Sequence, residues 1–261
     1  MKVSEKVLFI KNWILNYVNS MPVKAQSLVI GISGGIDSSV TSTLCAMTGL
    51  KTIALTMPIK QNKDQNDLSL LHKKWLTNNF KNVETHLLEL DNVFKNFENT
   101  LSNFKSEHGM ANSRARLRMT TLYQVAAANK GIVVGTGNKV EDFGVGFYTK
   151  YGDGGVDLSP IADLIKTDVR NIAKHLGIIS EIIKAPPTDG LWDDSRTDED
   201  QIGATYLELE KAMKQIEKNI SIHNLSPREK EVYDILSYFN SANKHKMLPI
   251  PICIIPKKYK I

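Results

Sequence analysis

The chain has 261 residues, and its 33 lysines and arginines exceed its 28 acids by a formal net charge of +5. A composition of 42% apolar and 23% charged residues is that of a folded globule and excludes a disordered chain. Two cysteines exclude a disulfide framework, and no apolar stretch approaches the roughly 18 residues of a membrane span. Lys6 and Lys11 interrupt the apolar pattern of the N-terminus, so it is not a signal peptide and we expect a cytoplasmic protein.

Helices and strands are predicted to alternate along the first half of the chain. Helical spacing of apolar residues covers residues 3–18, 37–47, 68–76 and 112–129, and β-prone runs cover residues 27–33, 51–57, 83–90 and 131–135. Alternation at this spacing predicts an α/β fold, a doubly wound parallel sheet flanked by helices on both faces. Ligands of such sheets bind beyond the carboxyl ends of the strands, which is where the turns after residues 33 and 135 lie.

The second half begins with two long segments that lack a periodic pattern. Residues 138–160 are rich in glycine and residues 185–200 in aspartate, and loops of this length in compact domains are often functional. Thr197–Asp200 and Ser226–Glu229 fit capping boxes, which predict two further helices. The apolar face of the first of these helices is core-forming and comprises Ile202, Tyr206, Leu209 and Met213. No repeat or linker divides the chain, so we expect a single domain over residues 1–261.

The most informative segment is Ser33-Gly-Gly-Ile-Asp-Ser-Ser39, which joins a predicted strand to a predicted helix. Free backbone N–H groups and a helix N-terminus bind phosphate, and glycines let the phosphate approach closely. The segment fits neither the Walker A nor the Rossmann pattern. Asp37 at the helix start would repel a bare phosphate, which favours a divalent cation between them. The simpler alternative is a capped turn in which Asp37 complements the helix dipole.

SGGIDSS resembles the pyrophosphate loop of the N-type ATP pyrophosphatases, which cleave ATP between its α and β phosphates to adenylate a substrate. Residues 135–155 (GTGNKVEDFGVGFYTKYGDGG) resemble the signature of ammonia-dependent NAD synthetases. Asp157–Pro160, Ala115–Met119, Pro187–Asp189 and His245-Lys246 also match in order and approximate spacing. The resemblance covers essentially the whole chain and implies the adenine nucleotide alpha hydrolase-like fold. Glutamine-using members carry an added nitrilase-like domain, for which this chain has no room, so we expect the ammonia-dependent form.

The resemblance implies a two-step reaction that amidates deamido-NAD. The nicotinate carboxylate attacks the α-phosphorus of ATP to give an NAD-adenylate and pyrophosphate, and ammonia then releases NAD and AMP. It also implies Mg²⁺, a homodimer and small-molecule substrates only. Val140 stands where many members have serine, and a hydroxyl contact is therefore missing. We expect the loops 140–155 and 186–200 to be mobile when empty and to close over the adenylate.

The same resemblance implies roles for individual residues. The ATP phosphates would contact Gly31, Ile32, Ser33, Gly34, Gly35, Ile36, Asp37 and Ser38, and further ATP contacts would come from Thr136, Lys166 and Thr188. Deamido-NAD would contact Arg116, Lys150, Asp157, His245 and Lys246. Asp37 and Glu141 would ligate Mg²⁺, while Lys166 and Asp153 would be catalytic, with Asp153 taking a proton from ammonium or ordering the nucleophile.

Simpler alternatives stand beside these roles. Taken alone, Glu141 is an exposed loop acid, Lys166 a solvated lysine at a helix start, and Thr136 and Asp153 turn residues. Of the three arginines at 114, 116 and 118, two would be surface charges. A basic chain also leaves open an RNA-modifying adenylase of the same superfamily, and a non-catalytic adenylate sensor is a third hypothesis.

Overall fold

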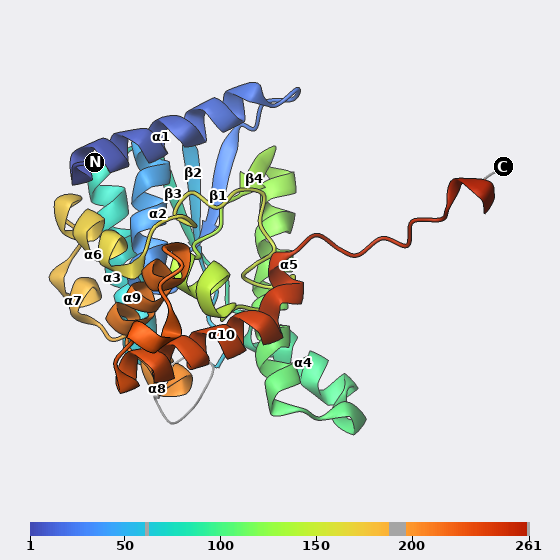
Figure 1. Ribbon diagram of the computed structural model, residues 1–261. Helices are drawn as coiled ribbons and strands as arrows, with labels where there is room; N and C mark the ends of the chain where they lie inside the picture. The colour runs from blue at the N-terminus through green and yellow to red at the C-terminus, as the bar shows by residue number, and fades with distance from the viewer. Residues whose placement is uncertain (61–62, 188–196, 260–261) are drawn as a thin grey trace.

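The computed structural model describes residues 1–60, 63–187 and 197–259, in which a parallel sheet lies between two layers of helices (Figure 1). The strands are β1 (Ser27–Gly31), β2 (Lys51–Thr56), β3 (Val83–Leu87) and β4 (Gly131–Val133). The helices of the first half are α1 (Val3–Ser20), α2 (Ile36–Met47), α3 (Lys63–Asn79), α4 (Asp91–Thr100) and α5 (Glu107–Ala128). The second half contains the π-helical segment η2 (Val140–Val145), α6 (Lys166–His175), α7 (Ser180–Lys184), α8 (Asp198–Ile202), α9 (Tyr206–Glu217) and α10 (Pro227–Met247).

Both faces of the sheet are buried at β1, β2 and β4. Leu28 and Ile30 of β1 belong to the core that α1, α2 and α6 close, whereas Val29 packs toward α5 on the opposite face. The neighbouring strands continue this alternation, with Ile132 in the first core and Ile53 in the second. Because neither face of β1, β2 and β4 meets water, these strands are mostly apolar runs, whereas the edge strand β3 alternates and leaves Glu84 and His86 exposed. The predicted doubly wound sheet is confirmed.

The order β3-β2-β1-β4 creates a switch point between β1 and β4. The chain moves outward from β1 through β2 to β3 and then returns to place β4 on the other side of β1. The helix that follows β1, α2, covers one face, whereas α5 on the other face leads into β4, and the ends of these two strands open the crevice at their carboxyl side. The glycine turn and the turn at Thr136 both lie at these ends, as predicted.

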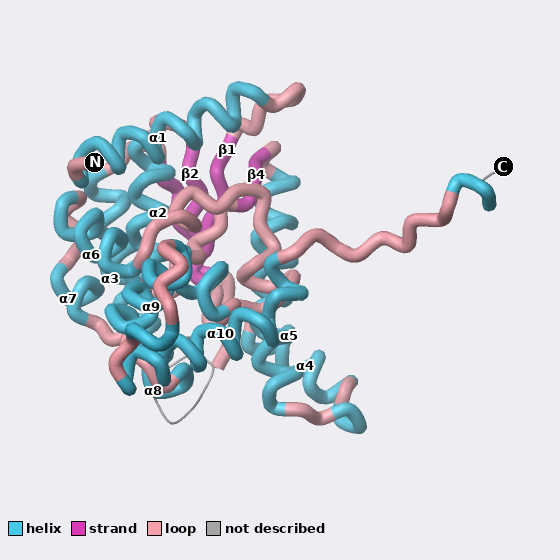
Figure 2. The backbone as a smooth tube through the Cα atoms, in the orientation of Figure 1, coloured by secondary structure: helices cyan, strands magenta, loops and turns pink. Residues whose placement is uncertain are grey.

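The second half of the chain forms a core of its own around η2. Buried side chains of α8, α9 and α10 pack on those of η2, among them Val140, Val145, Leu209 and Leu236. Figures 1 and 2 show these helices beyond the carboxyl ends of the strands, where they cover the crevice from outside the sheet. The single helix expected from residue 197 to 213 is wrong. Gly203 adopts φ +83°, and Thr205 caps a new helix by accepting a hydrogen bond from the Glu208 backbone N–H.

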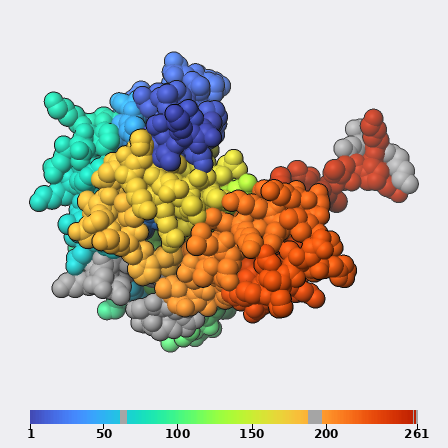
Figure 3. Space-filling model, turned by 60° about the vertical axis from the view of Figure 1, so that its left-hand side comes forward, coloured from blue at the N-terminus to red at the C-terminus, as the bar shows by residue number. Residues whose placement is uncertain are grey.

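Other boundaries differ by a few residues. The strand expected over 27–33 ends at Gly31, and the helix expected from residue 112 begins at Glu107, where Ser106 caps it. After α10 the chain runs without helix or strand from residue 248 to 256, away from the body (Figures 1 and 3), with Ile252 and Ile254 81% and 82% exposed. Within the described residues, no helix has both the length and the hydropathy that crossing a bilayer requires.

Candidate active site

The glycine turn after β1 is held by its own serines. Ser33 Oγ accepts a hydrogen bond from the Gly35 N–H at 3.1 Å, and Ser38 Oγ accepts from the Ser33 N–H at 3.2 Å and donates to the Gly35 carbonyl at 3.0 Å. Gly34 has φ +91°, a conformation that side chains disfavour. Gly35 is the N-cap of α2 and makes no side-chain cap bond, so the helix begins with open backbone donors. Such an N-terminus favours a phosphate.

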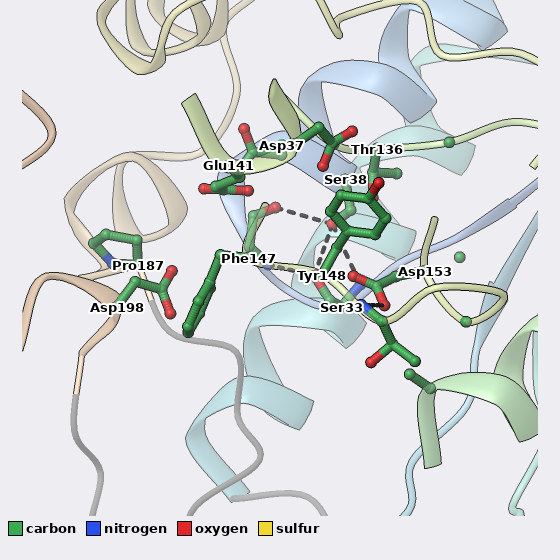
Figure 4. A pocket seen from close by; sticks show the side chains of 18 of the residues that line it. Ser33, Asp37, Ser38, Thr136, Glu141, Phe147, Tyr148, Asp153, Pro187 and Asp198 are labelled. Atoms are coloured by element: carbon green, nitrogen blue, oxygen red, sulfur yellow. Dashed lines mark hydrogen bonds between the residues drawn. The ribbon is translucent and has the colours of Figure 1, made fainter. Parts of the chain in front are cut away.

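Lys166 bridges two carboxylates, those of Asp37 and Glu141, which lie 104 positions apart in the sequence. Its Nζ is 2.6 Å from Asp37 Oδ2 and 2.7 Å from Glu141 Oε1, and the lysine side chain is only 2% exposed. The structure thus excludes both simpler alternatives, the solvated lysine and the exposed loop acid. Figure 4 shows Asp37 and Glu141 at the wall of one pocket. The sheet supplies Asp37 at the start of α2, and the segment after β4 supplies Glu141 in η2.

A second set of donors fixes the two carboxylates. Asn138 is fully buried, and its Nδ2 donates to Asp37 Oδ1 at 3.1 Å while its Oδ1 accepts from the Glu141 N–H at 3.1 Å. The Tyr206 hydroxyl donates to Glu141 Oε1 at 2.6 Å. Three neighbours, Lys166, Asn138 and Tyr206, therefore orient the pair, and its geometry does not depend on one contact.

Burial and charge shift the two acids in opposite directions. Burial raises the pKa of Asp37, and the charge of Lys166 only partly offsets it. Burial also acts to raise the pKa of Glu141, but the charge and hydrogen bond of Lys166 and the bond from Tyr206 outweigh it, so this pKa lies below its usual value. Burial would lower the pKa of Lys166, yet both carboxylates raise it above its usual range. The lysine remains charged.

The donor set fits Mg²⁺ only with help from a substrate. Among the described residues, no cluster of three or more His, Cys, Asp or Glu side chains forms a metal site. Asp37 and Glu141 supply carboxylate oxygens close enough for one ammonium to contact both. Mg²⁺ takes six oxygens and usually keeps waters and substrate phosphates among them, so two carboxylates beside a phosphate-binding turn suit it.

A cavity of about 560 Å³ opens beside this group. Twelve of the residues predicted to act at the site line it: Gly31, Ser33, Gly34, Gly35, Ile36, Asp37, Ser38, Thr136, Glu141, Asp153, Lys166 and Lys246. Ile32 is instead buried in the core behind the turn. Thr188 lies outside the described residues.

Asp153 belongs both to a turn and to the cavity. Its Oδ1 accepts a hydrogen bond from the Thr149 N–H at 2.9 Å, which is the turn role, while the carboxyl remains open to the cavity that Figure 4 shows. Desolvation by the surrounding protein raises the pKa of the Asp153 carboxyl, and the hydrogen bond from the Thr149 N–H offsets part of this rise. A carboxylate with a raised pKa is a stronger base.

Most residues predicted to bind the dinucleotide gather at one edge of the cavity, outside its lining. Arg116 Nε donates to the Lys150 carbonyl at 3.3 Å, and Lys150 Nζ donates to the His245 carbonyl at 2.7 Å. Lys246 lines the cavity and donates to the carbonyls of Gly146 and Tyr148. Asp157 lies apart from them, because its carboxylate accepts from the Val133 N–H and the Tyr123 hydroxyl at the end of β4.

The cavity also contains residues that the sequence did not single out. Arg118 is no surface charge, because it lines the cavity, its Nε donates to the Met57 carbonyl at 2.9 Å, and burial lowers its pKa to about 10. Asp142 lines the cavity too, and burial together with the charges of Glu141 and other acids raises its pKa to about 8. A Cβ at Gly137 would fall on the Asp142 carboxylate, so a side chain there would displace that acid.

Comparisons with known proteins agree on one family. The family model described as NAD synthase matches residues 6–249. An NH(3)-dependent NAD(+) synthetase from Finegoldia magna is 40% identical over 200 residues, which are 76% of this chain and 79% of that protein. The solved structure of NMN synthetase from Francisella tularensis has a TM-score of 0.83 and 29% identity, covering 98% of this chain and 99% of that one. NH3-dependent NAD synthetase from Campylobacter jejuni, in complex with nitrate, has a TM-score of 0.79 and 26% identity, covering 97% and 100%.

Proposed function

The chain belongs to the NAD synthase family and is an enzyme of ammonia-dependent NAD formation, and we propose that the cavity beside β1 is where it amidates deamido-NAD. The observation that carries this proposal is the buried group Asp37–Lys166–Glu141 at the phosphate-binding turn. ATP is the co-substrate, as the family implies. The RNA-modifying alternative is not favoured, because the relatives are NAD or NMN synthetases.

The first step has to bring an anion to a polyanion. We propose that the turn from Gly31 to Ser38 binds the ATP phosphates through its backbone N–H groups and the α2 N-terminus. The Lys166 ammonium then neutralises charge as the nicotinate carboxylate attacks the α-phosphorus and pyrophosphate leaves. When bound, Mg²⁺ supplies further charge neutralisation, and Asp37 and Glu141 would hold it. Thr136 and Thr188 are proposed as additional ATP contacts.

The second step needs neutral ammonia. Asp153 is open to the cavity with a raised pKa, and we propose that it accepts one proton from ammonium. The nitrogen lone pair then attacks the activated acyl carbon, the C–O bond to AMP breaks, and the nitrogen gives its extra proton to the departing AMP phosphate, which leaves the amide of NAD. The adenylate is required because a free carboxylate has no good leaving group.

The dinucleotide would extend from the cavity toward the edge formed by Arg116, Lys150 and His245. Basic side chains at this edge and Lys246 suit its two phosphates. Asp157 is bonded to β4 and Tyr123, so we propose that it acts on the substrate by fixing that strand end.

We propose that the enzyme is a cytoplasmic homodimer. The segment 248–256 supports a dimer, because it leaves four isoleucines, Ile250, Ile252, Ile254 and Ile255, at least half exposed in one short stretch. A second copy would bury this apolar surface. Sedimentation of the full chain tests the dimer, and a monomer at micromolar concentration would contradict it.

One observation favours a second substrate. The structure from Francisella tularensis is an NMN synthetase. NMN lacks the AMP half of NAD, so the corresponding acid would be nicotinate mononucleotide, which carries the same carboxylate. An assay with ATP, Mg²⁺ and ammonium tests both candidates when deamido-NAD and nicotinate mononucleotide are supplied in equal amounts. We expect NAD and AMP as the main products. A tenfold preference for NMN formation would reverse the order, and release of ADP instead of AMP would exclude both.

A further inference from the structure

A tyrosine that the sequence places in the core also touches the catalytic group. Tyr206 is 1% exposed, and its hydroxyl lies 2.6 Å from Glu141 Oε1 and 3.1 Å from Asp198 Oδ2. We propose that Tyr206 is a positioning residue, whose hydroxyl fixes the Glu141 carboxylate in the orientation that holds the nucleotide-bound cation with Asp37. The proposal rests on the function assigned above to this site.

The pattern of donors on Glu141 supports this role. Lys166 and Tyr206 both donate to the same oxygen, Oε1. The side chain of Asn138 also supports this carboxyl, which lines the cavity. Two donors on one oxygen set the rotation of the carboxylate toward the cavity, where it can meet a ligand. Partners of this kind orient a metal ligand without touching the metal.

Tyr206 is itself held at both ends. Its backbone N–H donates to Glu199 Oε1 at 2.8 Å, and its ring packs in the core around η2. The break in the helix at Gly203 makes this possible, because Tyr206 becomes the first residue of α9 and its N–H has no helical partner. A single helix through residue 206 would use that N–H and turn the ring elsewhere.

The ring and the hydroxyl have separable roles. Lys166 Nζ lies 4.8 Å from the Tyr206 ring centroid, a cation–π contact that phenylalanine keeps. The change Tyr206→Phe therefore removes the bonds to Glu141 and Asp198 and retains the packing. Tyr238 is 71% exposed, so Tyr238→Phe is a matched control for the loss of one hydroxyl.

The experiment measures binding and turnover with full-length protein. ATP binding is followed by calorimetry in EDTA and in Mg²⁺, and NAD formation is followed as Mg²⁺ is varied. For Tyr206→Phe we expect an ATP affinity in EDTA equal to that of the wild type. In Mg²⁺, the variant should bind ATP about tenfold more weakly than the wild type, and at limiting Mg²⁺ its kcat/KM for ATP should be tenfold to hundredfold lower. KM for ammonium and all Tyr238→Phe values should stay at wild type.

A merely structural role predicts a different result. It would weaken ATP binding equally in EDTA and in Mg²⁺, or lower the unfolding temperature without changing the Mg²⁺ dependence, and either outcome overturns the proposal. If Tyr206→Phe does not fold, Asp198→Ala carries the test, because it removes the second acceptor that holds the hydroxyl in place and should shift the Mg²⁺ dependence in the same direction by a smaller factor. An unshifted Asp198→Ala then overturns it. The ATP-binding measurement needs no turnover, so a wild-type protein that makes no NAD contradicts the proposed function separately.

Discussion

The two sides of the catalytic group are built in different ways. The sheet side supplies Asp37 through a short turn whose backbone and serines fix its position, and burial raises the pKa of this acid. The helical side supplies Glu141 from η2, and side-chain donors from distant elements hold it with a lowered pKa. The protein therefore disfavours the ionised form of Asp37 and favours the ionised form of Glu141. Backbone geometry places the first acid, and hydrogen bonds place the second.

The largest effect is expected from removing the residue that both sides share. In Lys166→Met, two buried carboxylates lose their ammonium, and NAD formation should fall at least a hundredfold. The free energy of unfolding should drop by about 3–5 kcal/mol, because breaking a buried pair leaves uncompensated charge. Urea unfolding and an NAD assay measure the two losses.

Lys139→Met is the control for that change. Lys139 is 30% exposed and its Nζ lies 3.1 Å from Glu217, so its removal should cost less than about 1 kcal/mol. Equal losses in the two variants would mean that Lys166 does not neutralise the acids.

The next largest effect separates the two acids. Glu141 has a folded-state pKa below its unfolded value, so its ionised form stabilises the fold at neutral pH, and that stability is lost as pH falls. Asp37 has a raised folded-state pKa, so its ionisation opposes folding at neutral pH. Without Mg²⁺ at pH 7, Glu141→Gln should therefore be the less stable of the two variants.

Urea unfolding of the two variants measures this difference. Both should stop NAD formation, because each removes a proposed Mg²⁺ ligand. If Asp37→Asn were the less stable variant, the contrast between the two sides would be wrong.

The same contrast explains what the sequence could predict. The glycine turn, the strands and the place of Asp37 follow from local patterns, since a strand, two glycines and a helix start are adjacent in the chain. The burial of Lys166 does not, because its partner Asp37 lies 129 positions earlier and only the fold brings them together. The resemblance to a known family predicted functional roles for Glu141 and Lys166, whereas the local sequence pattern alone predicted that both are exposed charges.

Tyr206 shows where a local signal was present and was not used. Its helical spacing with Leu209 predicts a core residue, and Tyr206 does pack in the core around η2. This spacing gives no sign of the hydrogen bond from the Tyr206 hydroxyl to Glu141. Thr205 and Glu208 form a capping box, which indicates that a new helix begins at residue 206. The start of α9 was therefore predictable, whereas the contact between its first side chain and η2 depends on tertiary packing.

The third effect concerns the pH dependence of stability on the sheet side alone. His72 is fully buried with its Nε2 2.9 Å from Ser42 Oγ of α2, and burial lowers its pKa to about 4. The unfolded chain binds a proton near pH 6.5, so the stability is complete above that pH and falls by about 3 kcal/mol as pH drops toward 4. The free energy of unfolding of His72→Gln should lack this part of the acid dependence.

On the helical side the pH dependence of stability has the opposite sign. The pKa of Asp142 is raised to about 8, so its ionisation opposes folding as pH rises. A His72→Gln profile that runs parallel to wild type would remove His72 as the cause.

The smallest effect is expected where the two sides meet at the surface. Arg116 of α5 is exposed, and its bond to the Lys150 carbonyl is long at 3.3 Å, so Arg116→Ala should leave the unfolding free energy almost unchanged. If Arg116 binds a phosphate of the dinucleotide, KM for deamido-NAD should rise about threefold to tenfold with kcat intact, because the contact is the same in the ground and transition states. Steady-state kinetics measure this, with Arg228→Ala, an exposed arginine outside the cavity, as the control. An unchanged KM would leave Arg118, which lies two residues further along α5 and lines the cavity, as the arginine of α5 that meets the substrate.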